Sequence, residues 1–139
     1  MKKLRTTLLP VLFILSISAF GQKDSTNTKE PWVAPPQADE LTNPFVGDKE
    51  ALKKGRVIYT SECVVCHGAN GDAVTNVAKN LQQKPKNFTM EDFQKQTDGA
   101  IFYKLSEGRG LMQPFKTMLS EEEIWSVIEY VKYLARDDE

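Results

Sequence analysis

The position of the two cysteines and the histidine restricts this chain more than any other feature. Among 139 residues these three side chains occur once each in the run Cys63-Val64-Val65-Cys66-His67, and nowhere else. Cys and His alone therefore offer at most three metal ligands, one fewer than a closed structural zinc site needs. A bis-histidine iron site is impossible within one chain, and a Ser-His-Asp triad would have to use His67 itself.

The same run is the attachment signature of a c-type haem, because two thiols three positions apart are followed directly by His. Each Cys sulfur adds to a haem vinyl group as a thioether, and the short loop places His67 beneath the iron as a nitrogen ligand. We therefore predict one covalently attached haem c per chain, held by Cys63 and Cys66. We expect a backbone carbonyl in the loop near Pro85 to accept a hydrogen bond from the second ring nitrogen of His67.

Three other uses of the two cysteines compete with haem attachment. A disulfide between Cys63 and Cys66 would close only a tiny loop and add little stability. A thioredoxin-like dithiol needs a βαβ setting, which the sequence lacks. A zinc knuckle needs a fourth ligand.

A methionine is the natural second axial ligand, because no other His is present and a thioether suits haem iron. Met112 lies in the run Gly108-Arg109-Gly110-Leu111-Met112-Gln113-Pro114-Phe115. Glycine permits unusual backbone angles beside a flat ring, and proline stiffens the other side. We predict that Met112 is the ligand and that Met90 and Met118, which lack this setting, are not.

Apolar periodicity predicts an all-α chain. A first helix runs from about residue 49 to the first Cys, with Asp48 as its cap, and Gly55 on its apolar face indicates a close helix crossing. A final helix follows the capping-box pair Ser120 and Glu123. Its apolar stripe is Ile124, Val127, Ile128, Val131 and Leu134, with Trp125 and Tyr130 beside it and Glu129, Lys132 and Arg136 on the polar face.

Two shorter helices are predicted between these, one capped by Thr89 and reaching Gln94, the other starting at Thr97 or Asp98 and ending before Gly108. The loop over residues 67–88 holds too few apolar residues to fill a core. About four modest helices would be marginal in a domain of this size without a large apolar group at the centre. The haem would supply that group.

Residues 48–135 resemble a class I c-type cytochrome of the small bacterial monohaem kind. The resemblance implies a cytochrome c-like fold, with about four helices and long loops around one haem, in which Gly55 meets the last helix near Val127 and Tyr130. Many relatives have Pro directly after the ligand Met, whereas Gln113 intervenes here. The motifs that carry the resemblance are Gly55 and Tyr59 ahead of Cys63-Val64-Val65-Cys66-His67-Gly68, the run from Gly108 to Phe115, and Trp125 and Tyr130 in the last helix.

Residues 1–21 have the pattern of a cleaved signal peptide. Lys2, Lys3 and Arg5 precede an apolar stretch of about 13 residues that contains Pro10, and a spanning helix needs roughly 20. The small residues Ala19 and Gly21 place cleavage before Gln22, so we expect a periplasmic protein that meets a membrane only through partners or an uncleaved signal. Removing these three basic residues shifts the net charge from −1 to about −4, and no basic patch indicates nucleic acid.

Residues 22–47 are polar and contain four prolines, without a helical or strand period. We interpret them as a Pro-rich tether or a strap over the surface of a domain formed by residues 48–139. Trp32 is unusual in a tether and is expected to anchor it to the domain or to a partner.

His67 and Met112 together would leave no open position on the iron, which predicts an electron carrier rather than an enzyme. We expect transient redox partners in a respiratory or related chain, such as a quinol-oxidising complex and an oxidase or reductase. Two alternatives remain open: a fixed electron-transfer subunit of a larger enzyme, and a haem peroxidase or gas sensor with a labile sixth ligand.

Overall fold

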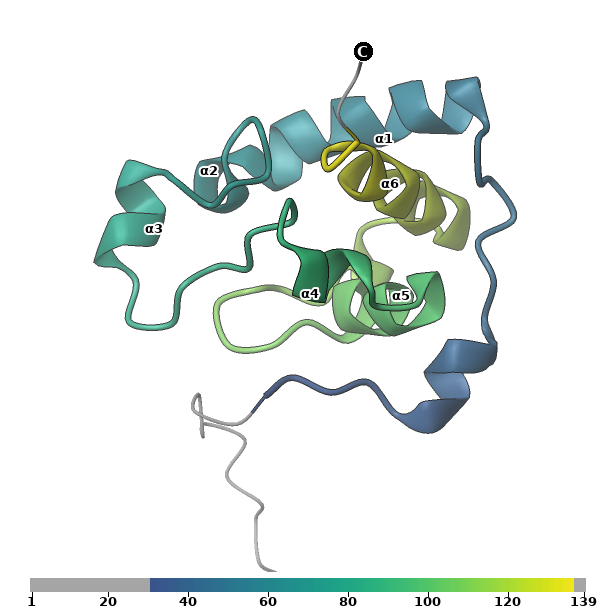
Figure 1. Ribbon diagram of the computed structural model, residues 1–139, viewed down its shortest axis with the longest axis horizontal. Helices are drawn as coiled ribbons and strands as arrows, with labels where there is room; N and C mark the ends of the chain where they lie inside the picture. The colour runs from purple at the N-terminus through teal and green to yellow at the C-terminus, as the bar shows by residue number, and fades with distance from the viewer. Residues whose placement is uncertain (1–30, 137–139) are drawn as a thin grey trace, which may run out of the picture.

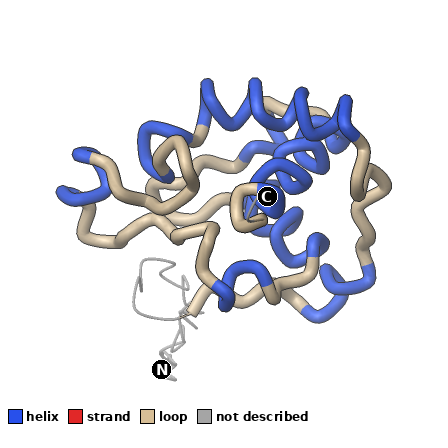
Figure 2. Tube along the Cα trace, turned by 45° about the horizontal axis from the view of Figure 1, so that its top comes forward, coloured by secondary structure: helices blue, strands red, loops and turns tan. Residues whose placement is uncertain are grey.

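The computed structural model describes residues 31–136, so the predicted signal peptide and residues 22–30 lie outside the described part. Only helices and loops occur within residues 31–136 (Figure 2). The all-α prediction is confirmed. In chain order the elements are η1 (Pro36–Glu40), α1 (Lys49–Glu62), α2 (Val64–His67), α3 (Asn76–Asn80), α4 (Glu91–Gln94), α5 (Asp98–Glu107), η2 (Phe115–Thr117) and α6 (Glu121–Tyr133), where η marks a 3-10 helix.

Helices α1 and α6 form the largest helix–helix contact of the described residues and cross near the top of the molecule in Figure 1. The crossing occurs at Gly55, where a Cβ atom would lie 1.9 Å from the carbonyl oxygen of Ser126 and 3.1 Å from the Cβ atom of Tyr130. Only glycine lets the two backbones approach this closely. The predicted crossing is therefore confirmed.

Both long helices begin with the predicted caps. The Asp48 carboxylate accepts hydrogen bonds from the N–H groups of Glu50 and Ala51, and Ser120 and Glu123 form a complete capping box. These side chains satisfy N–H groups that have no partner within the helix.

The shorter helices depart from the prediction in two places. Thr97 caps α5 as expected, but α4 starts after Met90, and the Thr89 hydroxyl donates to the Asn87 side chain instead of capping the helix. Helices α2 and α3 were not predicted. Thr75 caps α3, because its side chain accepts a hydrogen bond from the N–H of Ala78. Many other polar residues surround it in the predicted loop, so the sequence did not single it out as a cap.

The core is aromatic and aliphatic and lies between α1, α5 and α6. Tyr59 is completely buried, and its ring packs against Tyr130 at a centroid distance of 5.1 Å and against Phe88 at 6.2 Å. Phe102 of α5 stacks on Trp125 of α6 at 4.2 Å, which joins these two helices. No helix among the described residues is long and apolar enough to span a membrane.

Residues 31–47, which we call the N-terminal segment, run beneath α5 and then up the side of the molecule to α1 (Figure 1). Ala38 and Asn43 of this segment are buried, and Trp32 is half-buried. The boundary at residue 48 between a strap and a domain stays a prediction.

Glu129 is buried, so its predicted place on the polar face of α6 is wrong. Its side chain accepts a hydrogen bond from the Gly47 N–H at 3.1 Å and lies 3.4 Å from Arg136. The helical period alone does not reveal this, because Gly47 is 82 residues away in the sequence. The N-terminal segment covers that face of α6 and supplies the partner that a buried carboxylate needs.

Candidate haem-binding site

The two thiols and the imidazole lie on one short turn of helix. Cys63 ends α1, with its N–H donating to the Tyr59 carbonyl, and its own carbonyl accepts from the N–H of Cys66 at 3.1 Å and of His67 at 2.9 Å. Cys63 caps the start of α2, and side chains three and four positions apart share one face of a helix, so this turn holds the three side chains together. Both thiols are free and half-buried, and burial raises the pKa of the Cys63 thiol to about 12.

The His67 ring is oriented by two neighbours. Its Nδ1 lies 3.0 Å from the Lys86 carbonyl oxygen, one residue from the predicted position near Pro85, and Phe88 stacks on the ring at 4.3 Å. A carbonyl only accepts, so Nδ1 carries the proton and Nε2 keeps a lone pair for a metal. Burial lowers the pKa of His67, which favours the neutral form that binds a metal.

The chain after His67 is held to α1 and to the segment before α4. The Tyr59 hydroxyl donates to the Gly68 carbonyl at 2.6 Å, and the Phe88 N–H donates to the Gly71 carbonyl at 2.7 Å. Gly68 has φ +79°, and a Cβ atom there would lie 2.5 Å from the Asp72 side chain. These contacts fix the backbone that directly follows His67.

Met112 lies on a tight hairpin between α5 and η2. Arg109 and Met112 exchange both backbone hydrogen bonds, at 2.8 and 3.1 Å. Gly108 directly follows α5 with φ +64°, and a Cβ atom there would lie 2.4 Å from the Met112 carbonyl oxygen. The glycine predicted to permit an unusual backbone thus occupies a position that no other residue fits without displacing the hairpin.

The three methionines of the described part differ in their surroundings. Met112 is half-buried and packs against the core, whereas Met90 and Met118 are each 54% exposed. A Cβ atom at Gly110 would lie 3.4 Å from the Gln83 side chain, in the segment that leads to Lys86. The methionine hairpin therefore approaches the segment whose carbonyl orients His67, and both lie toward the same side of the molecule in Figure 1.

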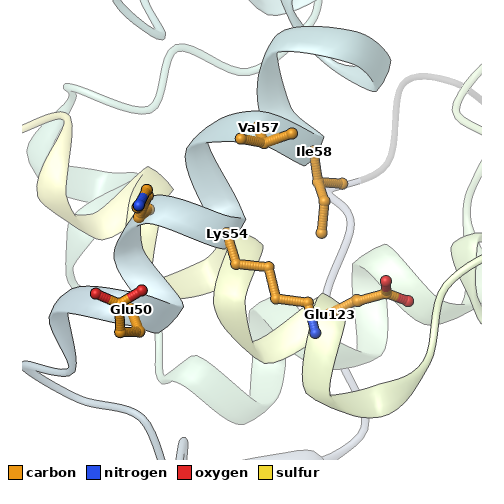
Figure 3. Close-up of a pocket in the computed structure, with 6 residues that line it drawn as sticks. Glu50, Lys54, Val57, Ile58 and Glu123 are labelled. Atoms are coloured by element: carbon orange, nitrogen blue, oxygen red, sulfur yellow. The ribbon is translucent and has the colours of Figure 1, made fainter.

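A separate pocket lies on the outer face of α1, as Figure 3 shows. Its lining comes from α1 and from the first turn of α6, and none of the four predicted site residues contributes to it. The pocket is lined by Glu50, Lys53, Lys54, Val57, Ile58 and Glu123.

The helical fold and the cysteine–histidine turn define a small class I c-type cytochrome. The chain belongs to the family described as cytochrome c oxidase, cbb3-type, subunit III, which matches residues 50–131.

Relatives support the same class. The chain is 34% identical over 91 residues to a cytochrome c6-like protein of Nostoc, covering 66% of this chain and 76% of the relative. It is 29% identical over 80 residues to cytochrome c6 of Parathermosynechococcus lividus, covering 58% and 86%. Among solved structures, the KustC0563 c-type cytochrome matches with a TM-score of 0.53 at 28% identity, covering 59% of this chain and 98% of that one. The protein is therefore an electron-transfer haem protein with covalently bound haem c.

The residues present fit that group. Two free thiols, an imidazole whose lowered pKa favours the neutral form, and a half-buried thioether together could attach and ligate a c-type haem. The sequence did not reveal the stacking of Phe88 on His67 or the bond from Tyr59 to Gly68. The stacking could have been suggested by the aromatic residue Phe88, which lies two positions after Lys86 in the sequence.

Proposed function

We propose that the protein is an exported monohaem electron carrier of the periplasm. In this proposal Cys63 and Cys66 attach the haem and His67 and Met112 are the axial ligands. The observation that supports it most directly is the pair of constrained donors: an imidazole oriented by Lys86 and a thioether on a hairpin that Gly108 shapes.

Haem supplies a one-electron change between ferric and ferrous iron. The residues of this chain restrict the site to that change. His67 and Met112 would occupy both axial positions, so no position remains for oxygen, peroxide or a substrate, and the chain would act as a carrier and not as an enzyme. A thioether ligand raises the reduction potential, because a soft donor favours ferrous iron.

Redox partners would dock beside the methionine hairpin. Leu111 at its tip is 80% exposed, and Val65 between the two cysteines is 59% exposed, so apolar side chains of both segments are available for contact. Weak redox interfaces bury less than about 1,200 Å² and dissociate readily. We propose transient partners in a respiratory or related chain, with a quinol-oxidising complex and an oxidase or reductase as candidates.

A fixed electron-transfer subunit is the second candidate, because the matching family is described as a subunit of an oxidase. Co-purification of the native protein with other subunits through size-exclusion chromatography would favour it over a free carrier. Isolation of a monomer that exchanges electrons with added partners would favour the carrier.

The axial assignment is tested by absorption spectra of Met112→Ala, with Met90→Ala and Met118→Ala as matched controls. The parent and both controls should show the weak far-red band of Met-ligated ferric haem, and Met112→Ala should lack it. Reduced Met112→Ala should also bind carbon monoxide, which the parent should not bind rapidly. Loss of the band in Met118→Ala instead, or rapid carbon monoxide binding by the parent, would refute the assignment.

A further inference from the structure

The first turn of α5 lies directly against the backbone of the N-terminal segment. A Cβ atom at Gly99 would lie 1.8 Å from the Ala38 carbonyl oxygen and 2.8 Å from the Leu41 carbonyl oxygen. The Thr97 hydroxyl also donates to the Asp39 carboxylate. No side chain separates η1 from this face of α5, so any atom added at Gly99 must displace the segment or the helix.

The same segment is fastened to α6 at two further points. The Asn43 side-chain amide donates to the Trp125 carbonyl at 3.3 Å, and Gly47 donates to the buried Glu129 carboxylate. Trp125 in turn stacks on Phe102 of α5. Helix α5 is therefore held between α6 on one face and a segment that is itself tied to α6 on another.

Helix α5 leads directly into the methionine hairpin. Its last residue is Glu107, Gly108 follows, and Met112 lies four residues beyond. A ten-residue helix is marginal by itself, so its position depends on the surfaces that pack against it. A shift of α5 would be passed to Met112 through Gly108, which is packed so closely against the hairpin that a Cβ atom there would lie 2.4 Å from the Met112 carbonyl oxygen and 2.6 Å from the Pro114 nitrogen.

We propose that the N-terminal segment is a positioning element for the Met112 sulfur, acting through α5. This inference rests on the proposed role of Met112 as a ligand. The segment lies before residues 50–131, the part that the family model matches, so the match itself does not imply this role. Without the segment, α5 would move and the sulfur would leave the iron for a larger fraction of the time.

Gly99→Ala tests the proposal, and Gly55→Ala is its matched control. Each adds one methyl group at a backbone contact closer than 2 Å, but Gly55 faces α6 and not α5. For each variant, loss of the far-red band on heating is compared with loss of helix by far-UV circular dichroism. In Gly99→Ala the band should disappear well below the unfolding transition, the reduction potential should fall, and the apparent carbon monoxide affinity should rise about tenfold. In Gly55→Ala the gap between the two transitions should equal that of the parent.

Asn43→Ala provides a test that adds no atom, in case Gly99→Ala does not fold. It removes the hydrogen bond to Trp125. The far-red band should be lost at a lower temperature than in the parent and the reduction potential should fall, each by less than in Gly99→Ala. An unchanged gap, potential and carbon monoxide affinity in Asn43→Ala, or equal gaps in Gly99→Ala and Gly55→Ala, would overturn the proposal. A parent without the far-red band would overturn the ligand assignment as well, so the two failures are distinguishable.

Discussion

The chemistry of the candidate site depends on a few individual contacts around His67. Burial lowers the pKa of the imidazole, which favours its neutral form, and the Lys86 carbonyl accepts a hydrogen bond from Nδ1. The carbonyl of the next residue, Gly68, accepts a hydrogen bond from the hydroxyl of Tyr59, which is completely buried. Burial also raises the pKa of Tyr59, so this hydroxyl stays protonated and able to donate.

Tyr59→Phe should therefore lower the free energy of unfolding by about 1–3 kcal/mol, because the buried Gly68 carbonyl loses its partner. Urea unfolding of the holoprotein measures this. Thr117→Val is the control, since its hydroxyl donates to the Pro114 carbonyl in an exposed setting and its loss should cost less than about 0.5 kcal/mol. Equal effects of the two substitutions would contradict a special role for the buried bond.

At the scale of the elements, side-chain caps provide hydrogen-bond acceptors for N–H groups in the first turn of α1, α3, α5 and α6. Helix α6 begins with a capping box in which the Ser120 N–H and hydroxyl both donate to the Glu123 carboxylate. These bonds lower the pKa of Glu123. The carboxylate is also close to the positive end of the helix dipole, which favours its charged form.

Ser120→Ala should destabilise the protein by about 1 kcal/mol, the usual cost of losing an N-cap.

The pKa of Glu123 is lower in the folded than in the unfolded state, so the contribution of this carboxylate to stability is present at neutral pH and is lost as the pH falls through the folded pKa. Denaturant unfolding between about pH 5 and pH 3 should thus show a weaker pH dependence in Glu123→Gln than in the parent. Glu121→Gln removes a charge from the same turn outside the box, and a matching loss of pH dependence there would contradict this account.

At the scale of the whole molecule, we expect the bound haem to complete the protein interior. Helices α2, α3 and α4 have four or five residues each, and Val74 and Leu111 are 67% and 80% exposed. The packed part consists mainly of α1 crossing α6, with α5 beside them. A small domain buries a smaller fraction of its surface than a large one, so we expect the bound haem to add to the stability of this core.

The double variant Cys63→Ser/Cys66→Ser should thus lose cooperative thermal unfolding and part of its helix content. Far-UV circular dichroism and calorimetry measure both. The parent treated with acid and acetone should retain its colour on the polypeptide, because thioethers resist extraction. A double variant that melts with the cooperativity of the parent would show that the polypeptide core is sufficient.

Local patterns in the sequence determined a large part of this protein. The Cys63-Val64-Val65-Cys66-His67 run and the caps Asp48 and Ser120 depend on neighbours within a few residues. Gly55 indicated a close helix crossing through the absence of a side chain, although the partner helix lies far along the chain. The candidate ligand Met112 was selected in the same way, from the glycines and proline around it. Such features are visible in one dimension because their physical causes are local.

Only the tertiary structure decided which distant groups complete these local features. It selected the Lys86 carbonyl for His67, placed Phe88 on the ring, and buried Glu129 beneath Gly47. It also set the N-terminal segment against α5. Each of these contacts joins residues far apart in the chain, and a buried polar group accepts whichever partner the packing of other elements brings within reach, so the sequence pattern around it cannot name that partner.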